Sequence, residues 1–182
     1  MLLDNEVREK LSQYLQLMGN DILLKVHVGT DPASAQMSEL IQELAGLSAK
    51  IHVEEAALPR VPSFSVNKIN QDVGITFAGI PLGHEFTSLV LALLQTSGYP
   101  PKIDASIVEQ IKSIKGTFNF ETYISLTCHN CPDVVQALNI MSLLNPNISH
   151  TMVDGAIFKE EVEAKNILAV PSVYLNGEPF SS

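Results

Sequence analysis

The sequence is poor in several residue types, and each shortage excludes something. Its 182 residues include only two cysteines and no tryptophan. Lysine and arginine together number 11 against 20 aspartates and glutamates, so the formal net charge is −9. This excess of negative charge repels phosphate backbones and anionic lipid headgroups. We therefore expect a protein that binds neither nucleic acid nor membranes.

Long apolar runs are also missing. The longest, Phe86–Leu94, is much shorter than the ~20 residues that a bilayer-spanning helix needs. The N-terminus carries Asp4 and Glu6 and has no basic cluster, which argues against a signal peptide. Because 46% of the residues are hydrophobic and 17% are charged, the composition is that of a globular chain. We expect a cytoplasmic protein, in which a Cys-x-x-Cys pair is more often catalytic or metal-binding than structural.

Both cysteines lie in one short segment, Thr127–Cys131 (Thr-Cys-His-Asn-Cys). Residues 118–126 before it are rich in branched and aromatic side chains, which predicts a strand. Residues 132–144 after it begin with proline and repeat apolar side chains at helical spacing, which predicts a helix. The pair therefore lies at a strand-to-helix turn, where free backbone N–H groups and the helix dipole favour a thiolate.

Disulfide exchange at such a turn needs one attacking and one resolving thiol. We expect Cys128 to be the exposed nucleophile and Cys131, one turn into the helix, to be the resolving thiol. His129 can carry a positive charge that stabilises the Cys128 thiolate. A zinc site would need two more closely spaced ligands, and the other histidines are scattered singly, so no metal site is expected. An inert cysteine pair in a loop is the remaining alternative.

The order of expected elements repeats along the chain. Each half predicts a helix, a strand, a turn, a second helix and further strands, and Val61–Asn67 matches Val170–Asn176 in sequence. Two prolines, Pro100 and Pro101, separate the halves. We expect an α/β chain of two units: residues 1–100, without a dithiol, and residues 101–182, with the Cys-x-x-Cys pair.

The motifs together resemble a known family. The strand, the cysteine turn, the following helix and the segment around Val170–Asn176 resemble a thioredoxin or glutaredoxin unit. Two longer strings, Pro81–Leu94 and Ser125–Asn139, resemble the N-terminal domain of the F subunit of alkyl hydroperoxide reductase, and the likeness covers essentially the whole chain. It implies two tandem thioredoxin-like units with central mixed β-sheets flanked by helices. A complete unit of this kind would still need a closing strand and helix, so we expect residues 101–182 to be C-terminally truncated.

The resemblance also implies a function. In this family NADH reduces FAD, FAD reduces a dithiol of the flavoprotein part, and that dithiol reduces the N-terminal disulfide, here Cys128–Cys131. Cys128 then attacks the disulfide of the peroxiredoxin partner, which is the C subunit of alkyl hydroperoxide reductase. The present sequence has no glycine-rich dinucleotide motif, so no cofactor is expected in it, and FAD and NADH belong to the flavoprotein part of a longer chain.

Other functions stay open at this point. The runner-up is a free-standing disulfide oxidoreductase or isomerase, or a glutaredoxin-like reductase that uses glutathione. The alternatives that are not enzymes are a binding module with an incidental dithiol and a redox sensor.

The proton acceptor departs from the thioredoxin pattern. Thioredoxins carry an aspartate six residues before the first cysteine, where this chain has Thr122, and the neighbouring Glu121 should point to the other face of the sheet. A carboxylate for the Cys131 proton must then come from elsewhere, and Glu85, at the start of an apolar helix, is the candidate. Alternatively, Glu85 only favours a helix N-terminus.

The remaining site residues follow from the resemblance. Pro171 matches the proline that these folds place opposite the dithiol in the cis form, and Pro62 would be its structural counterpart in the first unit. We expect Thr127, His129 and Pro171 to line the surface that meets the partner.

Overall fold

The computed structural model describes residues 2–181, which form one mixed eight-stranded sheet in the order β2-β1-β3-β4-β6-β5-β7-β8. The strands are β1 (Ile22–His27), β2 (Ile51–Glu55), β3 (Ser63–Lys68), β4 (Gln71–Ala78), β5 (Phe118–Ile124), β6 (Ile148–Asp154), β7 (Ser172–Leu175) and β8 (Glu178–Ser181). The helices are α1 (Asn5–Leu15), α2 (Pro32–Leu47), the 3-10 turn η1 (Gly83–Glu85), α3 (Phe86–Thr96), α4 (Ala105–Ser113), α5 (Cys131–Leu144) and α6 (Lys159–Ala164). The predicted α/β architecture of a mixed sheet flanked by helices is confirmed.

The two halves of the chain share this sheet. The first half contributes β1–β4 and the second half β5–β8, and the halves join where β4 pairs in parallel with β6. This pairing runs from Ile75 opposite His150 to Ala78 opposite Val153. The sequence predicted a sheet in each unit, and the structure joins the two into one continuous sheet.

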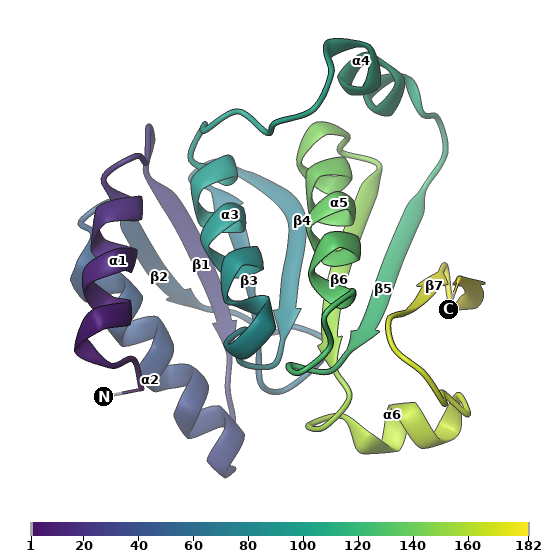
Figure 1. Ribbon diagram of the computed structural model, residues 1–182, viewed down its shortest axis with the longest axis horizontal. Helices are drawn as coiled ribbons and strands as arrows, with labels where there is room; N and C mark the ends of the chain where they lie inside the picture. The colour runs from purple at the N-terminus through teal and green to yellow at the C-terminus, as the bar shows by residue number, and fades with distance from the viewer. Residues whose placement is uncertain (1, 182) are drawn as a thin grey trace.

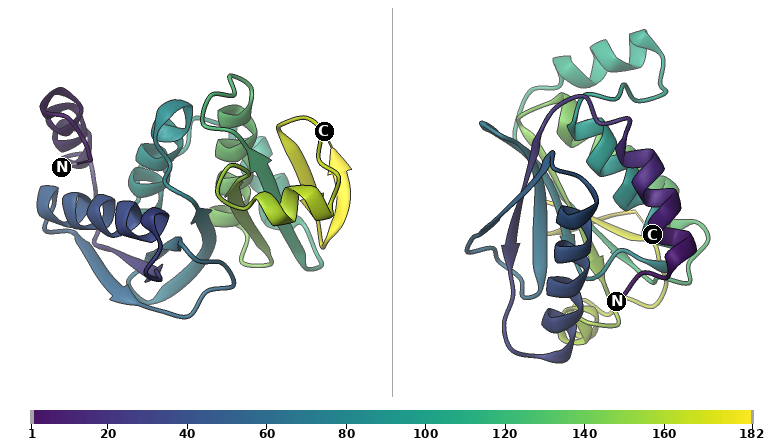
Figure 2. Two further views of the ribbon diagram at one scale, coloured as in Figure 1. Left: turned by 90° about the horizontal axis from the view of Figure 1, so that it is seen from below. Right: turned by 90° about the vertical axis from the view of Figure 1, so that its left-hand side faces the viewer.

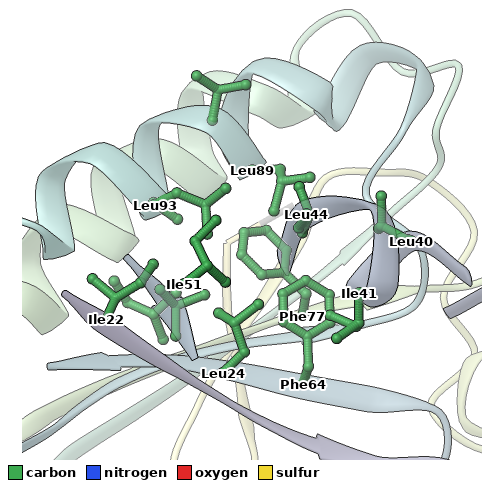
Figure 3. Close-up of a cluster of buried hydrophobic side chains, with 14 of the residues drawn as sticks. Ile22, Leu24, Leu40, Ile41, Leu44, Ile51, Phe64, Phe77, Leu89 and Leu93 are labelled. Carbon is green, nitrogen blue, oxygen red and sulfur yellow. The ribbon is translucent and has the colours of Figure 1, made fainter. Parts of the chain in front are cut away.

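Helices cover one face of the sheet and pack into one core. In Figure 1, α1, α3 and α5 run side by side across this face. Alternate residues of β1 are buried against them, as period-2 side-chain alternation requires. Figure 3 shows the part of this cluster contributed by the first half, with Ile22, Leu24, Leu40, Ile41, Leu44, Ile51, Phe64, Phe77, Leu89 and Leu93 labelled. The same cluster continues to Cys131 and Val135 of α5, so one apolar core connects the halves.

Within residues 2–181, the opposite face of the sheet carries no layer of helices like the first (Figure 2), and the α6 region packs on part of it. Phe158 and Val162 of the α6 region pack there on Tyr123 and Tyr174. Beside them, Arg60 from the first half forms ion pairs with Glu121 and Glu161 from the second half. These ion pairs give the halves a second connection, on the face away from the apolar core.

The strand predicted at residues 118–126 and the helix predicted at residues 132–144 correspond to β5 and α5. The polar segment Phe158–Leu168 also predicts a helix, but α6 ends at Ala164, and Asn166 then takes a positive φ of 53°.

The pair Asn176-Gly177 after a strand predicts a tight hairpin turn. This hairpin is present, since Asn176 and Gly177 have φ of 50° and 84° between β7 and β8. Positive φ at both central residues matches the right-handed twist of the paired strands. None of the helices within residues 2–181 combines the length and apolar character needed to cross a bilayer.

Candidate active site

The two cysteines form a disulfide at the turn between β5 and α5. Their Cα atoms are 5.5 Å apart. Cys131 is fully buried in the apolar core, whereas Cys128 is only partly buried. The sequence predicted the first cysteine at the helix N-terminus, but α5 begins at Cys131 and Cys128 lies in the preceding turn. An incoming thiol or disulfide can therefore reach Cys128 but not Cys131.

Cys128 faces the segment that precedes β7. The Sγ of Cys128 lies 3.9 Å from the carbonyl oxygen of Val170, and the Val170–Pro171 peptide bond is cis. Thr127 is exposed next to Cys128, and its Oγ1 lies 3.0 Å from the Oγ of Ser125. Thr127, Cys128 and Pro171 thus belong to one neighbourhood at this end of the sheet. Pro62, in the first half, also follows a cis peptide bond.

The first half of the chain supports the cysteine turn through η1. The backbone N–H of His84 donates to the carbonyl oxygen of Leu126 at 2.9 Å, and the rings of His84 and His129 are in contact with centroids 4.4 Å apart. Gly83 has φ of 56°, and a Cβ there would lie 2.9 Å from the Leu126 oxygen. Only glycine fits without displacement. In the sequence His84 is one of the singly placed histidines, and nothing local to it predicts this contact.

Glu85 is fully buried directly after His84. The hydroxyl of Ser88 donates to its Oε1 at 2.7 Å, and among residues 2–181 its Oε2 has no hydrogen-bond partner. Burial raises the pKa of Glu85, and the Ser88 hydrogen bond opposes that rise. The side-chain amide of Gln136 on α5 donates to the Ser88 oxygen at 3.1 Å. A carboxyl from the first half is thus connected to the helix that begins at Cys131, and Figure 1 shows the N-terminal ends of α3 and α5 close together.

Thr122, at the position of the thioredoxin aspartate, belongs to a different buried group. Its Oγ1 lies 2.8 Å from Nε2 of His150, and Nδ1 of His150 lies 2.7 Å from Oδ1 of Asn139. Burial lowers the pKa of His150 to about 3, so the imidazole is neutral at physiological pH. Its two ring nitrogens are both engaged, which ties β5 and β6 to α5. Glu121 points to the other face, toward Arg60, as its neighbouring position in the strand predicted.

Sequence patterns do not indicate the His150 group. His150 is a single histidine in a strand, and only its neighbours in space reveal its role. Within the part of the chain that the structure describes, no three histidine, cysteine, aspartate or glutamate side chains gather into a group able to hold a metal ion.

Comparison with known proteins identifies the relatives of this chain. Residues 118–182 match a family model described as "Thioredoxin domain". A Bacillus subtilis protein named "NADH dehydrogenase" is 65% identical over 182 residues, which are 100% of this chain and 36% of the relative. The F subunit of alkyl hydroperoxide reductase from Staphylococcus epidermidis is 54% identical over 181 residues, which cover 100% of this chain and 35% of the relative.

A solved structure extends the likeness to the fold. The crystal structure of the NTD_N/C domain of alkylhydroperoxide reductase AhpF from Enterococcus faecalis matches with a TM-score of 0.90 at 29% identity. The match covers 99% of this chain and 94% of that one. The chain is homologous to the N-terminal domain of the alkyl hydroperoxide reductase F subunit. The resemblance drawn from the sequence is confirmed, the fold is thioredoxin-like, and the chain spans 35–36% of the length of these two curated relatives.

Proposed function

We propose that this chain is a dithiol–disulfide electron-transfer domain of a peroxiredoxin reductase. It accepts two electrons from a dithiol in the flavoprotein part of a longer chain, where FAD and NADH bind. It passes them, in the cytoplasm, to the disulfide of the peroxiredoxin that forms the C subunit of alkyl hydroperoxide reductase. The observation that carries the proposal is the Cys128–Cys131 disulfide, which joins one accessible and one fully buried sulfur at a strand-to-helix turn. The relatives named as alkyl hydroperoxide reductase support the choice of partner.

The accessible sulfur is where electrons enter. A thiolate of the donor dithiol attacks Sγ of Cys128, the Cys128–Cys131 bond breaks, and Cys131 leaves as a thiolate that takes up a proton. The second donor thiolate then attacks the donor sulfur of the mixed disulfide, and Cys128 leaves. The donor ends as a disulfide and this domain as a dithiol.

Electrons leave through the same sulfur. The Cys128 thiolate attacks one sulfur of the partner disulfide, and the other partner sulfur leaves as a thiolate. Cys131 loses its proton and attacks Sγ of Cys128, which releases the second partner sulfur and restores the Cys128–Cys131 disulfide. The partner has then gained two electrons and two protons, and peroxide reoxidises it. Thr127, His129 and Pro171 border the sulfur that the partner meets.

Glu85 is the group we propose to take the Cys131 proton. Its Oε2 has no hydrogen-bond partner among the described residues, and burial raises the pKa of its carboxyl toward the range where a carboxylate can accept a thiol proton. The alternative at the Thr122 position is less suited, because both nitrogens of His150 are already hydrogen-bonded. In this view residues 1–100 form a scaffold unit that lends a carboxyl to the redox unit, residues 101–182.

Thiol transfer to an oxidised two-cysteine peroxiredoxin tests the proposal. The reduced chain should reduce it within seconds without glutathione, and Cys128→Ser should lower the rate at least ~1000-fold because the serine hydroxyl is not ionised. Cys131→Ser should accumulate a mixed disulfide through Cys128, visible by mass spectrometry. Transfer that depends on glutathione would favour a glutaredoxin-like reductase, and no transfer would leave a binding module or a sensor.

A further inference from the structure

Two side chains, Ser88 and Gln136, connect Glu85 to the solvent-facing side of the helix layer. Glu85 and Ser88 are both fully buried, while Gln136 borders a groove of about 660 Å³ on the outer side of α1, α3 and α5. The hydrogen bonds run from the Gln136 amide to Ser88 at 3.1 Å and from the Ser88 hydroxyl to Glu85 Oε1 at 2.7 Å. This chain of hydrogen bonds crosses from the second half of the molecule to the first.

The direction of these hydrogen bonds is fixed by chemistry. An ionised carboxylate can only accept, so the Ser88 hydroxyl donates to Glu85. The Ser88 oxygen then accepts, so Gln136 must turn its NH₂ group toward it. Oε1 is held as an acceptor in both protonation states of the carboxyl, and Oε2 is left to take or release the proton. Neither the Ser88 hydroxyl nor the Gln136 amide has to reorient when Oε2 takes or releases the proton.

The same two hydrogen bonds, from Gln136 to Ser88 and from Ser88 to Glu85, affect how strongly the Glu85 carboxylate binds a proton. A hydrogen bond donated to a carboxylate stabilises its charged form, and a second donor behind it polarises the first. Burial acts in the opposite direction, because it favours the neutral acid. The two donors therefore limit how strongly the buried carboxyl holds its proton.

We propose that Ser88 and Gln136 are positioning residues that hold Glu85 with Oε2 free for the Cys131 proton and keep its carboxyl ionisable. The inference rests on the proposed role of Glu85. Because Gln136 and Cys131 belong to the same helix, the hydrogen bonds also fix the carboxyl relative to the resolving thiol.

The ionisable groups around this pair of donors come from several elements. α3 carries none, η1 carries His84 besides Glu85, and α5 carries Cys131 and Asp133. Lys10, Tyr14, Tyr99 and Lys102 line the groove that Gln136 borders, and His150 of β6 is hydrogen-bonded to Asn139 of α5. His84, Asp133 and the adjacent His129 are exposed, so solvent screens their charges. A pH profile of disulfide closure in the variants below consequently reports mainly on Glu85 and Cys131.

The test uses an aromatic disulfide, 5,5′-dithiobis(2-nitrobenzoate), as the oxidant of the reduced chain. Attack by Cys128 releases one coloured thiolate, and closure by Cys131 releases the second, so the two steps are seen separately. Ser88→Ala should slow the second step about five- to tenfold below the midpoint of its pH profile and move that midpoint to higher pH, because Glu85 then binds its proton more tightly. Gln136→Leu should have a smaller effect in the same direction, and the first step should keep its rate in both variants.

Matched variants separate positioning from packing. Ser88→Thr keeps the hydroxyl and should restore the midpoint, and Gln95→Ala changes another glutamine of the groove and should leave the profile unchanged. A ¹³C NMR titration of the Glu85 carboxyl in Ser88→Ala, with the disulfide intact, should show the same upward shift without any reaction.

The outcomes distinguish the inference from the proposed function. If Glu85→Gln changes the profile of the second step but Ser88→Ala does not, the inference is overturned while the role of Glu85 stands. If Glu85→Gln leaves the profile unchanged, both the role of Glu85 and the inference fail. If Ser88→Thr behaves like Ser88→Ala, the effect is one of packing and the inference also fails.

Discussion

The strand-to-helix turns that precede α2 and α5 occupy corresponding places in the two halves but cap their helices differently. In the first half, Asp31 caps α2: its carboxylate accepts from the backbone N–H of Ser34 at 3.3 Å and from the Ser34 hydroxyl at 2.5 Å. In the second half, Asn130 occupies the cap position of α5 and makes no side-chain capping bond. The positive end of α2 is thus neutralised by a fixed anion, while that of α5 adjoins sulfur atoms whose charge depends on their redox state.

The strands that lead into these turns, β1 and β5, also differ in the polarity of the side chains that face the helices. β1 turns Ile22, Leu24 and Val26 toward the helices, all buried and apolar. β5 turns Phe120, Thr122 and Ile124 toward them, and Thr122 brings the hydrogen-bonded His150 with it. The helix-facing side of β1 is thus apolar, whereas that of β5 includes a buried hydrogen-bonded polar group. We infer that the shared apolar core and sheet offset the cost of burying this group in the second half.

The largest predicted effect is a loss of folding stability in acid, caused by the buried His150 in the second half. Burial lowers the pKa of His150 from 6.5 to about 3. Between these pH values the unfolded chain binds a proton at this histidine and the folded chain does not. The contribution of the neutral His150 to the unfolding free energy is therefore complete above pH 6.5 and is lost as the pH falls from 6.5 toward 3. At 1.36 kcal/mol per pKa unit, the loss between pH 7 and pH 5 is about 2 kcal/mol. Urea unfolding at a series of pH values measures it.

His150→Gln supplies the control for this effect. Glutamine keeps hydrogen-bonding groups but does not titrate, so the difference in unfolding free energy between wild type and variant should shrink as the pH falls from 7 to 5. Glu85 and Asp154, whose carboxyl pKa values burial raises, act with the opposite sign and are common to both proteins. A pH-independent difference would contradict the assignment of the acid effect to His150.

The second prediction concerns the contact by which the first half supports the second. Gly83→Ala places a Cβ 2.9 Å from the carbonyl oxygen of Leu126 at a φ of 56°. We expect it to lower the unfolding free energy by about 1–3 kcal/mol, since an L residue is strained at positive φ and the cysteine turn must shift. It should also slow disulfide exchange at Cys128. Urea denaturation and thiol-transfer rates measure the two effects.

Gly46→Ala is the matched substitution. Gly46 lies inside α2, and a Cβ there would meet nothing within 4 Å. Alanine should stabilise this helix by ~0.5–1 kcal/mol and leave the exchange rate unchanged. Equal effects of the two substitutions would mean that η1 does not support the cysteine turn.

Features formed by residues that are close together in the sequence could be predicted, whereas contacts between residues far apart in the sequence could not. The cysteine turn, its flanking strand and helix and the Asn-Gly hairpin are local, so side-chain periodicity and turn chemistry revealed them. The continuous sheet was not predicted, because the pairing of β4 with β6 joins residues more than 70 positions apart. The roles of His84 and His150 depend on contacts with Leu126, His129, Thr122 and Asn139 that no short pattern encodes. The helical start of Cys131 was missed because local patterns do not fix the first residue of a helix.

The smallest predicted effect concerns the turn between β1 and α2, which contains no cysteine. Asp31→Ala removes the acceptor for the Ser34 N–H and hydroxyl at the start of α2, so the melting temperature should fall by about 2–4 °C. Asp31→Asn keeps a capping oxygen but not the charge and should recover part of that loss. The decisive measurement is the thiol-transfer rate of Cys128, which neither substitution should change, because this cap serves only its own helix. A drop in that rate would mean that the first turn takes part in redox chemistry and that the contrast between the two turns is wrong.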